Sequence, residues 1–506
     1  MPADFEHVII RPEFSSTSGP VNRWPISSIG MDRRTKIVVT IGPASEDEET
    51  LRALIRAGMD VARLGLAHGT IEEALERLRR IRRVAAEEGR RVGVLVDLPG
   101  PKVRSGSFGE VGVDVPTGSK VELRVGDAKS NASVIEVDYA FLMRDIEIGD
   151  RLTIGDGGAI LEVSDKSDDK MQATVVHGSL LRGRPGVHVP SDRLSISTPT
   201  PEDFEAIDAF VEAGVDMIAV SFVRSAHDIR RVGTEPHPRG PLVIAKIETR
   251  AAVDNLAGII EAAGAIMVAR GDLGNECSLE DLPHLQKQII RDCIAGGRPV
   301  ITATQMLESM VTAPAPTRAE ASDVANAVFD GTSAVMLSGE TAIGQDPVNV
   351  VRTMSRIAHR ADEEMDYEAW ARQLAEIRMT DVATETASVT DAMTMATWRA
   401  THELGINHVL CISGSGFTVR SMARFRPNAN ILGFSTNEAT VQQLTLSWGT
   451  TPVLMEKGGS NEEMVVEAIR LAREAGHLGS GDRVAVLAGT DSRSRSTNVL
   501  RIEQVP

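Results

Sequence analysis

Two apolar stretches of the chain end in charged residues that could bind a metal. The first, residues 244–248, ends in Lys-Ile-Glu, and the second, residues 267–272, ends in Arg-Gly-Asp. Lys246 and Glu248 stand two positions apart, so on a strand both side chains point to the same face. A buried strand rarely carries charge unless the charge is paired or binds a metal. Either stretch alone would favour a solvated salt bridge at a barrel rim, but the two together indicate a divalent metal site with a cation beside it.

A unit that repeats along the chain indicates the architecture that would hold these charges. A helical segment ends in glycine, as at Gly58, Gly214 and Gly264, and an apolar run follows. Glycine fits the left-handed position that closes a helix, and the apolar run is typical of a strand buried on both faces. The expected strands begin near Lys36, Asp60, Val92, Asp216, Leu242, Ala265, Pro299 and Ser333.

Eight such units favour an α/β fold built on a (β/α)8 TIM barrel over an open doubly wound sheet. A barrel of this kind carries its chemistry at the carboxyl ends of the strands. The residues expected there are Arg63, Asp97, Lys246, Glu248, Asp272 and Thr304. Two predicted helix starts, Ser45 with Glu48 and Thr317 with Glu320, have the capping-box pattern.

Two regions interrupt the repeat. Short alternating strands and Gly/Asp turns predict a small β-barrel domain inserted after the third strand, which could act as a lid. A second α/β pattern follows near the C-terminus, and the Pro/Ser-rich N-terminus has no periodicity. The expected parts are an arm (1–30), the barrel (31–103 and 186–360), the inserted domain (104–185) and the C-terminal α/β domain (375–506).

The length and composition of the chain limit the classes of function that it can have. A chain of 506 residues is too long for one core, so several domains are expected. The net charge of -17 argues against nonspecific nucleic-acid binding. Apolar runs are too short to span a membrane, and no leader pattern opens the chain, so no membrane partner is expected. The three cysteines form no spaced pattern, which indicates a reducing cytoplasm.

Longer motifs resemble those of pyruvate kinases. The resemblance opens with Thr35-Lys-Ile-Val-Val-Thr-Ile-Gly-Pro and runs from about Arg33 to the C-terminus. The most specific motifs are Lys246-Ile-Glu, Val268-Ala-Arg-Gly-Asp-Leu-Gly and Thr302-Ala-Thr-Gln-Met-Leu-Glu-Ser-Met. The resemblance implies a barrel, a lid, a C-terminal regulatory domain and a homotetramer. It implies glycolytic phosphoryl transfer from phosphoenolpyruvate to ADP, which gives pyruvate and ATP.

The residue types suit this chemistry, which is mostly positioning and charge neutralisation. Glu248 and Asp272 offer oxygen ligands to Mg²⁺ or Mn²⁺. Lys246 brings a cation to the moving phosphoryl group and the forming enolate, and Arg63 can hold phosphate. The backbone amides at Arg270, Gly271 and Asp272 can bind the substrate carboxylate if they begin a helix.

Other roles are implied by the resemblance alone. Thr304 would assist protonation of the enolate through water, although a local hydrogen bond would also explain its hydroxyl. The residues expected near the nucleotide are Thr40, Pro43, His68 and Arg104.

Several positions depart from the family pattern. Gly65 and Ala67 stand where Asn and Ser usually bind a monovalent cation, and neither offers a side-chain oxygen. Lys102 stands at a usual Glu position, an exchange found in members that do not require K⁺. Its ammonium, near Asp97, could occupy the place of the ion, so K⁺ is not expected to be required. A solvent-facing lysine and impaired activity are the alternative.

Further departures lie toward the nucleotide. Pro99 replaces part of a usual Thr-Lys pair, and Pro185 stands where many members have a second lysine, which Arg182 or Arg184 would have to replace. Asn275 replaces a commonly apolar residue. These changes leave open a relative with a different phosphoryl acceptor, or a non-catalytic regulatory binding protein.

A small-residue loop suggests regulation. Its residues are Ser413, Gly414, Ser415, Gly416 and Thr418, and it follows a predicted strand and opens a helix. Free amides at such a place can cradle a phosphate. The resemblance implies a phosphorylated allosteric effector there, whereas a plain strand-to-helix turn would explain the glycines equally well.

Overall fold

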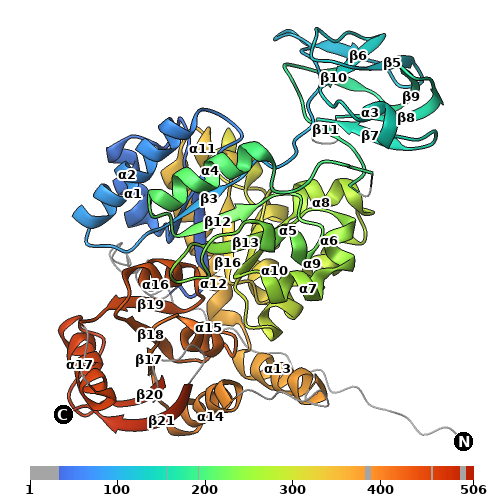
Figure 1. The fold of residues 1–506 in the computed structure, drawn as a ribbon. Coiled ribbons are helices and arrows are strands. Elements are labelled where there is room, and N and C mark those ends of the chain that lie inside the picture. The colour runs from blue at the N-terminus through green and yellow to red at the C-terminus, as the bar shows by residue number, and fades with distance from the viewer. Residues whose placement is uncertain (1–32, 156–157, 192, 382–388, 457–459, 490–496) are drawn as a thin grey trace, which may run out of the picture.

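A closed barrel of eight parallel strands forms the centre of the protein (Figure 1). The computed structural model describes residues 33–155, 158–191, 193–381, 389–456, 460–489 and 497–506, so the predicted arm at 1–30 lies outside the described residues. The barrel strands are β1 (Lys36–Thr40), β2 (Val61–Gly65), β3 (Gly93–Asp97), β12 (Met217–Val220), β13 (Leu242–Ile247), β14 (Ala265–Ala269), β15 (Val300–Ala303) and β16 (Ala334–Leu337). Each begins at the predicted residue or one residue later, and the predicted TIM barrel is confirmed.

The strands close in the order β1-β16-β15-β14-β13-β12-β3-β2. Apolar side chains such as Val38, Leu95 and Ile244 fill the interior, and a larger apolar layer lies between the strands and the helices around them. The helices of this part are α1 (Glu48–Ala57), α2 (Ile71–Glu87), α4 (Pro201–Glu212), α5 (Ala226–Arg231), α6 (Arg250–Asp254), α7 (Leu256–Ala262), α8 (Arg270–Glu276), α9 (Leu282–Ala295), α10 (Arg318–Phe329), α11 (Gly339–Ala342) and α12 (Pro347–Glu364), with a 3-10 turn, η2 (Glu308–Val311).

The helix ends confirm some sequence predictions and correct others. Thr317 caps α10 in a capping box with Glu320, as predicted. Ser45 does not cap α1, because Asp47 accepts the hydrogen bond from the Thr50 amide and takes that position. Ser45 instead accepts a hydrogen bond from the Gly42 amide, and its hydroxyl closes a turn before the helix.

The glycines that end helices also differ from one another. Gly58 and Gly214 have φ angles of 116° and 72°, as the left-handed closing position requires. The prediction is wrong for Gly264, because α7 ends in the extended Ala263. A Cβ on Gly264 would lie 2.5 Å from Leu242 Cδ1, so glycine is needed there for close packing against the neighbouring strand.

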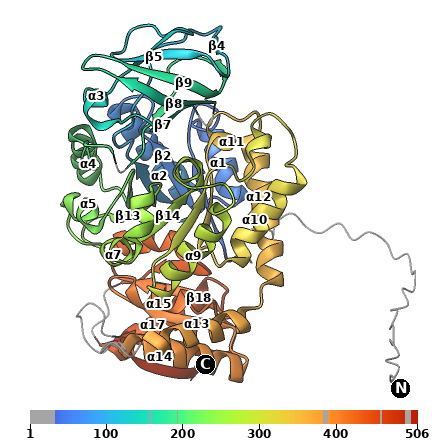
Figure 2. The same ribbon diagram turned by 90° about the vertical axis from the view of Figure 1, so that its right-hand side faces the viewer.

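The inserted region folds as a β domain with its own apolar core. Its elements are β4 (Val113–Val115), β5 (Lys120–Val125), β6 (Val134–Val137), α3 (Leu142–Asp145), β7 (Arg151–Ile154), β8 (Ala159–Lys166), β9 (Met171–His177), β10 (Ser179–Leu181) and β11 (Val187–His188). A curled six-stranded sheet has the order β11-β7-β8-β9-β5-β6, and β10 pairs with β4. The domain lies beyond one end of the barrel (Figures 1 and 2).

The C-terminal domain lies against the opposite end of the barrel (Figures 1 and 2). Its five-stranded sheet has the order β19-β18-β17-β20-β21, and only β21 is antiparallel to its neighbour. Its elements are α13 (Tyr367–Asp381), α14 (Val389–Leu404), β17 (His408–Ile412), α15 (Phe417–Ala423), β18 (Asn430–Ser435), α16 (Glu438–Gln443), η3 (Leu444–Leu446), β19 (Thr450–Leu454), α17 (Asn461–Glu474), β20 (Arg483–Gly489) and β21 (Thr497–Gln504). Lys36, which begins β1, donates to the Thr450 carbonyl, so the amino ends of the barrel strands face this domain.

Candidate active site at the carboxyl ends of the barrel strands

Lys246 lies at the centre of a buried network of charges. Its ammonium nitrogen is 2.8 Å from Glu248 Oε1 and 3.2 Å from Asp97 Oδ1. It also donates a hydrogen bond of 2.7 Å to the hydroxyl of Ser221. These partners follow or end three neighbouring strands, β3, β12 and β13, so the barrel closure brings together residues that lie far apart in the sequence.

Asp97 joins this network to a second cation. Arg63 Nε donates to Asp97 Oδ2 at 2.7 Å, and Arg63 Nη1 donates to the hydroxyl of Thr40 at 2.9 Å. One carboxylate therefore holds both the guanidinium of β2 and the ammonium of β13. Two cations fixed in this way form a site for a group with more than one negative charge.

Burial and neighbouring charges together set the pKa values of these groups. Burial raises the pKa of Glu248 to about 6, since the opposing effect of Lys246 is countered in part by the like charge of Asp272. Burial alone would raise the pKa of Asp97 as well, but Lys246 and Arg63 together hold it below its usual value. Burial acts to lower the pKa of Lys246, and the charges of Asp97 and Glu248 outweigh it, so Lys246 stays protonated.

Unusual backbone conformations hold two parts of the site. Phe222 has a φ angle of 54°, and its amide donates to Glu248 Oε2 at 2.7 Å. Thr304 and Gln305 have φ angles of 67° and 55°. Non-glycine residues in this region carry a strain of about 1–3 kcal/mol each and cluster at functional sites. The strain marks this end of the barrel as the functional end.

Thr304 does not continue its strand. It follows β15, and its hydroxyl accepts a hydrogen bond from the Gly271 amide at 2.8 Å and donates to the Ala303 carbonyl at 2.7 Å. A simple β-branched strand residue is therefore excluded, although a local hydrogen bond is present. The hydroxyl lines the same cavity as Lys246.

Glu248 and Asp272 have the chemistry of a divalent metal site. Both line one cavity of about 150 Å³, and the charge of Asp272 raises the pKa of Glu248. Two carboxylates that repel each other in a buried place gain from a hard divalent cation between them. The described residues contain no group of three or more His, Cys, Asp or Glu side chains arranged for a metal. Mg²⁺ needs few protein ligands where substrate and water supply the rest, so the residues fit this ion.

The cavity wall also contains the altered positions. Gly65, Ala67 and Pro99 line it and contribute no side-chain oxygen, while Lys102 lines it at the exposed lip. Asp97 lies on the same wall. Within the described residues, no carboxylate is within ion-pair distance of the Lys102 ammonium.

Arg270 is the predicted residue whose side chain turns away from the cavity. Its guanidinium forms an ion pair with Asp323 at 2.7 Å and donates to the carbonyl of Thr304 at 2.6 Å. A helix does begin at Arg270, as α8, so the condition for binding a carboxylate through its first amides is present, and that role stays a prediction. The side chain thus braces the loop that carries Thr304.

The residues predicted near the nucleotide are spread out. Thr40 is largely buried. Its hydroxyl accepts a hydrogen bond from Arg63 and donates one to the Leu337 carbonyl at 2.7 Å. Pro43 and His68 are exposed beyond the ends of β1 and β2. Arg104 lies at the base of the inserted domain and donates to the Arg184 carbonyl at 3.3 Å.

Sequence reasoning missed Ser221 and Phe222. Ser221 donates to the Leu98 carbonyl at 2.7 Å while it accepts from Lys246, so it fixes the lysine relative to β3. Both residues follow directly after β12, and the rule that chemistry lies at the carboxyl ends of strands could have selected them. A serine next to a phenylalanine carries no charge, and for that reason it gave no signal.

The small-residue loop lies where the sequence placed it, between β17 and α15. Gly416 has a φ angle of 73°, the Gly414 carbonyl accepts from Thr440, and the Ser415 carbonyl accepts from Arg420. Thr418 is buried, and its hydroxyl is 2.6 Å from that of Thr497. The Thr418 hydroxyl therefore forms a hydrogen bond within the domain and is not exposed at the surface.

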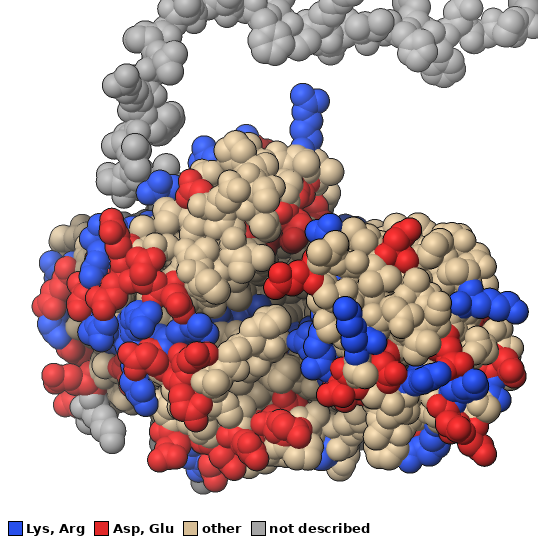
Figure 3. All heavy atoms as spheres, turned by 90° about the horizontal axis from the view of Figure 1, so that it is seen from above, with Lys and Arg blue, Asp and Glu red and all other residues tan. Residues whose placement is uncertain are grey.

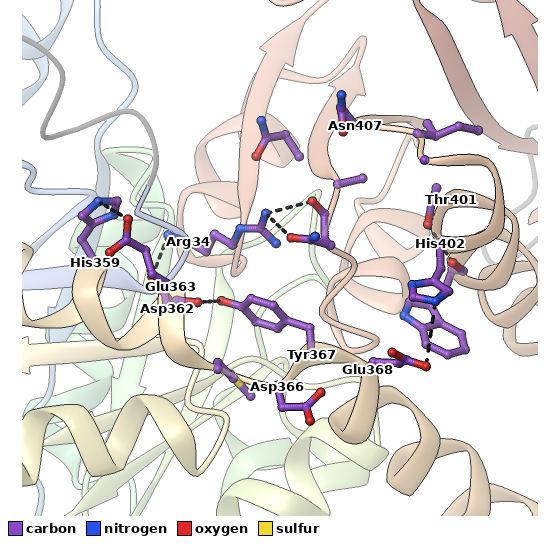
Figure 4. Close-up of a pocket in the computed structure, with 17 residues that line it drawn as sticks. Arg34, His359, Asp362, Glu363, Asp366, Tyr367, Glu368, Thr401, His402 and Asn407 are labelled. Atoms are coloured by element: carbon purple, nitrogen blue, oxygen red, sulfur yellow. Dashed lines mark hydrogen bonds and ion pairs between the residues drawn. The ribbon is translucent and has the colours of Figure 1, made fainter. Parts of the chain in front are cut away.

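A larger cavity, of about 690 Å³, lies between the barrel and the C-terminal domain (Figure 4). Its polar groups bind one another. Arg34 donates to the carbonyls of Pro427 and Asn428, and its guanidinium lies 5.0 Å from the centre of the Tyr367 ring. The Tyr367 hydroxyl donates to the Asp362 carbonyl. This cavity is thus a domain junction, and its size alone does not make it the reactive site.

The view from above looks onto the end of the molecule that carries the inserted domain (Figure 3). A hollow separates two lobes, and lysine, arginine, aspartate and glutamate side chains alternate over the face.

No helix among the described residues has the length and apolar character needed to cross a membrane.

The barrel and its buried cluster of two cations and three carboxylates define a TIM-barrel enzyme whose site suits a phosphorylated anion and a divalent metal. A family profile described as "Pyruvate kinase, barrel domain" matches residues 32–351, and one described as "Pyruvate kinase, alpha/beta domain" matches residues 391–503. The chain belongs to the pyruvate kinase family.

Individual relatives agree with the profiles. A pyruvate kinase of Bacillus licheniformis is 38% identical over 475 residues, which cover 93% of this chain and 80% of the relative. A pyruvate kinase of Thermococcus litoralis is 38% identical over 476 residues, which cover 94% and 99% of the two chains. A pyruvate kinase of Geobacillus stearothermophilus is 39% identical over 481 residues, which cover 94% and 81%.

Proposed function

We propose that the cluster around Lys246 performs the pyruvate kinase reaction, the transfer of the phosphoryl group of phosphoenolpyruvate to ADP. The observation that carries this assignment is the Asp97 carboxylate, which holds Arg63 and Lys246 side by side at the wall of one cavity. The same wall carries Glu248 and Asp272 as the metal ligands. A phosphorylated carboxylic acid meets two cations and one metal site there.

Each residue has a defined role in this proposal. Arg63 binds the phosphoryl group through a planar fork of donors. Lys246 neutralises charge on the moving phosphoryl group and then on the enolate oxygen. The amides at Gly271 and Asp272, at the start of α8, bind the substrate carboxylate, for which the Gly271 amide gives up its hydrogen bond to the Thr304 hydroxyl. Arg270 acts as a positioning residue through its ion pair with Asp323.

Thr304 acts last. Its hydroxyl lines the cavity beside Lys246, and the left-handed backbone holds it there. It assists the transfer of a proton to the enolate carbon through water, which gives pyruvate. Glu248 and Asp272 would hold Mg²⁺ or Mn²⁺, which when bound would supply neutralisation of the negative charge of the substrate.

Lys102 serves in place of a monovalent cation. It lines the same cavity as Gly65, Ala67 and Asp97, and its ammonium there supplies the charge that K⁺ would bring. The side chains of Gly65 and Ala67 have no oxygen to bind an ion. The enzyme therefore does not require K⁺.

The nucleotide binds between the barrel and the inserted domain, which closes as a lid. Thr40, Pro43 and His68 contribute from the ends of β1 and β2, and Arg104 contributes from the base of the lid. The hinge consists of the two strand connections at Arg104 and Gly186, which are bridged to each other. Closure excludes water during transfer.

The C-terminal loop at residues 413–418 receives a phosphorylated effector through its backbone amides. The protein works as a homotetramer in the cytoplasm. The free thiols of Cys277, Cys293 and Cys411 suit a reducing compartment.

A panel assay tests the proposal. Purified protein is mixed with phosphoenolpyruvate, Mg²⁺ and one nucleoside diphosphate at a time, and pyruvate is measured by coupling to lactate dehydrogenase. Pyruvate formation that requires a nucleoside diphosphate, with ADP among the acceptors, supports the assignment. Pyruvate formed equally well without any nucleotide would indicate a different acceptor, and no pyruvate under any condition would indicate a non-catalytic protein.

A further inference from the structure

Three buried arginines and one half-buried arginine line one small cavity between the barrel and the C-terminal domain. Arg298 comes from the barrel, just before β15, and Arg420, Arg424 and Arg426 come from α15 and the residues after it. The last three are 4%, 4% and 1% exposed. A guanidinium is rarely this buried unless it is paired, so the concentration of charge needs an explanation.

Two of these arginines have no carboxylate partner among the described residues. Arg420 donates to the Ser415 carbonyl at 2.9 Å and contacts His237 Nδ1 at 3.4 Å. Arg426 donates to the Gly331 carbonyl at 2.6 Å, and its guanidinium lies 4.5 Å from the centre of the Trp448 ring. Burial lowers the pKa of both groups to about 9.

Carbonyl groups offset only part of this charge. Arg298 donates to the Ile260 and Glu261 carbonyls near the end of α7, and Arg426 donates to a carbonyl just after α10. The carboxyl end of a helix carries about half a negative charge. Arg424 differs from Arg420 and Arg426, because it forms an ion pair with Asp391. The positive charge of Arg420 and Arg426 is therefore not paired with a carboxylate of any described residue.

Three buried donor atoms on the residues that line the cavity have no hydrogen-bond partner in the part of the chain that the structure describes. They are Arg420 Nη1, Arg426 Nε and the hydroxyl of Ser447. A buried polar group without a partner destabilises the fold, and more strongly when it is charged. Donors of this kind around one cavity indicate an acceptor between them, and the excess of guanidinium groups indicates that the acceptor is negatively charged.

The size of the cavity limits that acceptor to a single atom. Its volume is about 10 Å³, and one water-sized species needs roughly 10–15 Å³ on the same scale. Sulfate, phosphate and carboxylates are too large. A water molecule would fit and could accept hydrogen bonds, but it would leave the charge uncompensated.

We propose that this cavity binds one halide ion, chloride under ordinary conditions, between Arg298, Arg420, Arg426 and Ser447. The ion completes the hydrogen bonds of donors in the C-terminal domain, in a cavity whose wall also includes Arg298 of the barrel. It thereby stabilises the docking of the C-terminal domain on the amino end of the barrel. The site is separate from the catalytic cavity at the opposite end of the barrel strands.

Bromide diffraction tests the site directly. Crystals of the unmodified protein are grown in sodium bromide, and anomalous data are collected at the bromine absorption edge. The proposal predicts an anomalous peak in the cavity within hydrogen-bond distance of Arg420 and Arg426. A cavity that holds an ordered water and shows no anomalous peak, in crystals where surface bromides are visible, would overturn it.

Thermal unfolding provides a second test in solution. The Tm of the unmodified protein should rise with sodium chloride to a plateau, relative to sodium gluconate at equal ionic strength. The rise should disappear in Arg420→Met and remain in Arg399→Met, an exposed control on α14. If Arg420→Met does not fold, Ser447→Ala provides the test. In that variant, the chloride concentration that gives half of the rise in Tm should be several-fold higher. An equal rise in both salts, or an unchanged rise in Arg420→Met and Ser447→Ala, would contradict the proposal.

Discussion

Asp97 and Lys246 form an ion pair of 3.2 Å across the carboxyl end of the barrel, and this contact joins the two halves of the proposed active site. Asp97 ends β3 and also holds Arg63, while Lys246 lies near the end of β13 and also holds Glu248. The phosphate-binding side and the metal-binding side are thus connected through one carboxylate. Changes at either residue should affect both functions.

Removal of this carboxylate should impair both activity and stability. Asp97→Asn keeps the shape of the side chain but leaves Arg63 and Lys246 partly unpaired, and breaking a buried pair costs about 3–5 kcal/mol. We expect a lower midpoint in urea unfolding and a large loss of kcat/KM. Asp254→Asn, on the exposed surface of α6, provides the control. Equal stability of the two variants would contradict the role of Asp97.

The same variant also tests how the contribution of Asp97 to stability depends on pH. The pKa of Asp97 in the folded protein lies below its value in the unfolded chain. Its contribution to stability is therefore present above about pH 4 and is lost as the pH falls through the lowered pKa. The difference in unfolding free energy between Asp97→Asn and the unmodified protein should shrink on acidification below pH 4. A difference that grows on acidification would have the wrong sign.

Asp272→Ala tests the metal site. Glu248 alone cannot hold the ion, so we expect turnover to fall by about 100-fold or more and Mn²⁺ affinity to fall with it. Mn²⁺ binding is followed by the relaxation of water protons, which does not depend on activity. Asp281→Ala, outside the cavity, should behave as the unmodified protein. Unchanged Mn²⁺ binding in Asp272→Ala would remove Asp272 from the site.

Lys246→Met tests whether the lysine acts on the transition state. We expect kcat to fall by roughly 100- to 1000-fold, because a preorganised cation is lost where charge develops. The KM for phosphoenolpyruvate should change much less, since Arg63 and the metal still bind the substrate. Steady-state kinetics separate the two parameters. A variant with normal kcat and a strongly raised KM would show that Lys246 only binds substrate.

Lys102→Glu tests the replacement of K⁺. The unmodified protein should be equally active in Na⁺ and K⁺ at equal ionic strength. Reversal of one charge at the cavity lip should reduce activity by about tenfold, which corresponds to about 1.4 kcal/mol. Added K⁺ should not restore the variant fully, because Gly65 and Ala67 lack ligand oxygens. Lys120→Glu, exposed on the inserted domain, is the matched control.

A combined variant sharpens the K⁺ test. A Cβ at Gly65 would meet nothing closer than the Arg63 guanidinium at 3.7 Å, so the backbone leaves room for a side chain to begin there. Gly65→Asn with Ala67→Ser and Lys102→Glu should therefore gain activation by K⁺. Strong K⁺ activation of the unmodified protein would overturn the role of Lys102.

The barrel and most of the site could be predicted because buried parallel strands leave an unambiguous pattern. Each strand is a continuous apolar run, so a charge at its end, such as Lys246 or Asp97, is conspicuous. Ser221 was missed because a neutral hydroxyl at the same position is not conspicuous. The pattern also cannot give the direction of a long side chain, and Arg270 turns toward Asp323 on α10 instead of the cavity.

Local rules failed where tertiary contacts compete with them. The Ser45 pattern matches a capping box, but Asp47 lies closer to the helix and takes the cap. Gly264 matches a helix end, but packing against Leu242 explains it. The positive φ angles of Phe222 and Thr304 have no sequence signal, because the surrounding fold imposes them.

Phosphorus NMR of one reaction mixture tests the central assignment most directly. The mixture contains the unmodified protein, phosphoenolpyruvate, ADP and Mg²⁺ in a buffer that contains Na⁺ and no K⁺. We expect the phosphoenolpyruvate signal to decrease while the three signals of ATP increase by the same amount, and both changes to be far slower in Lys246→Met. Loss of phosphoenolpyruvate with release of inorganic phosphate, or ATP formation at an undiminished rate in Lys246→Met, would contradict the assignment.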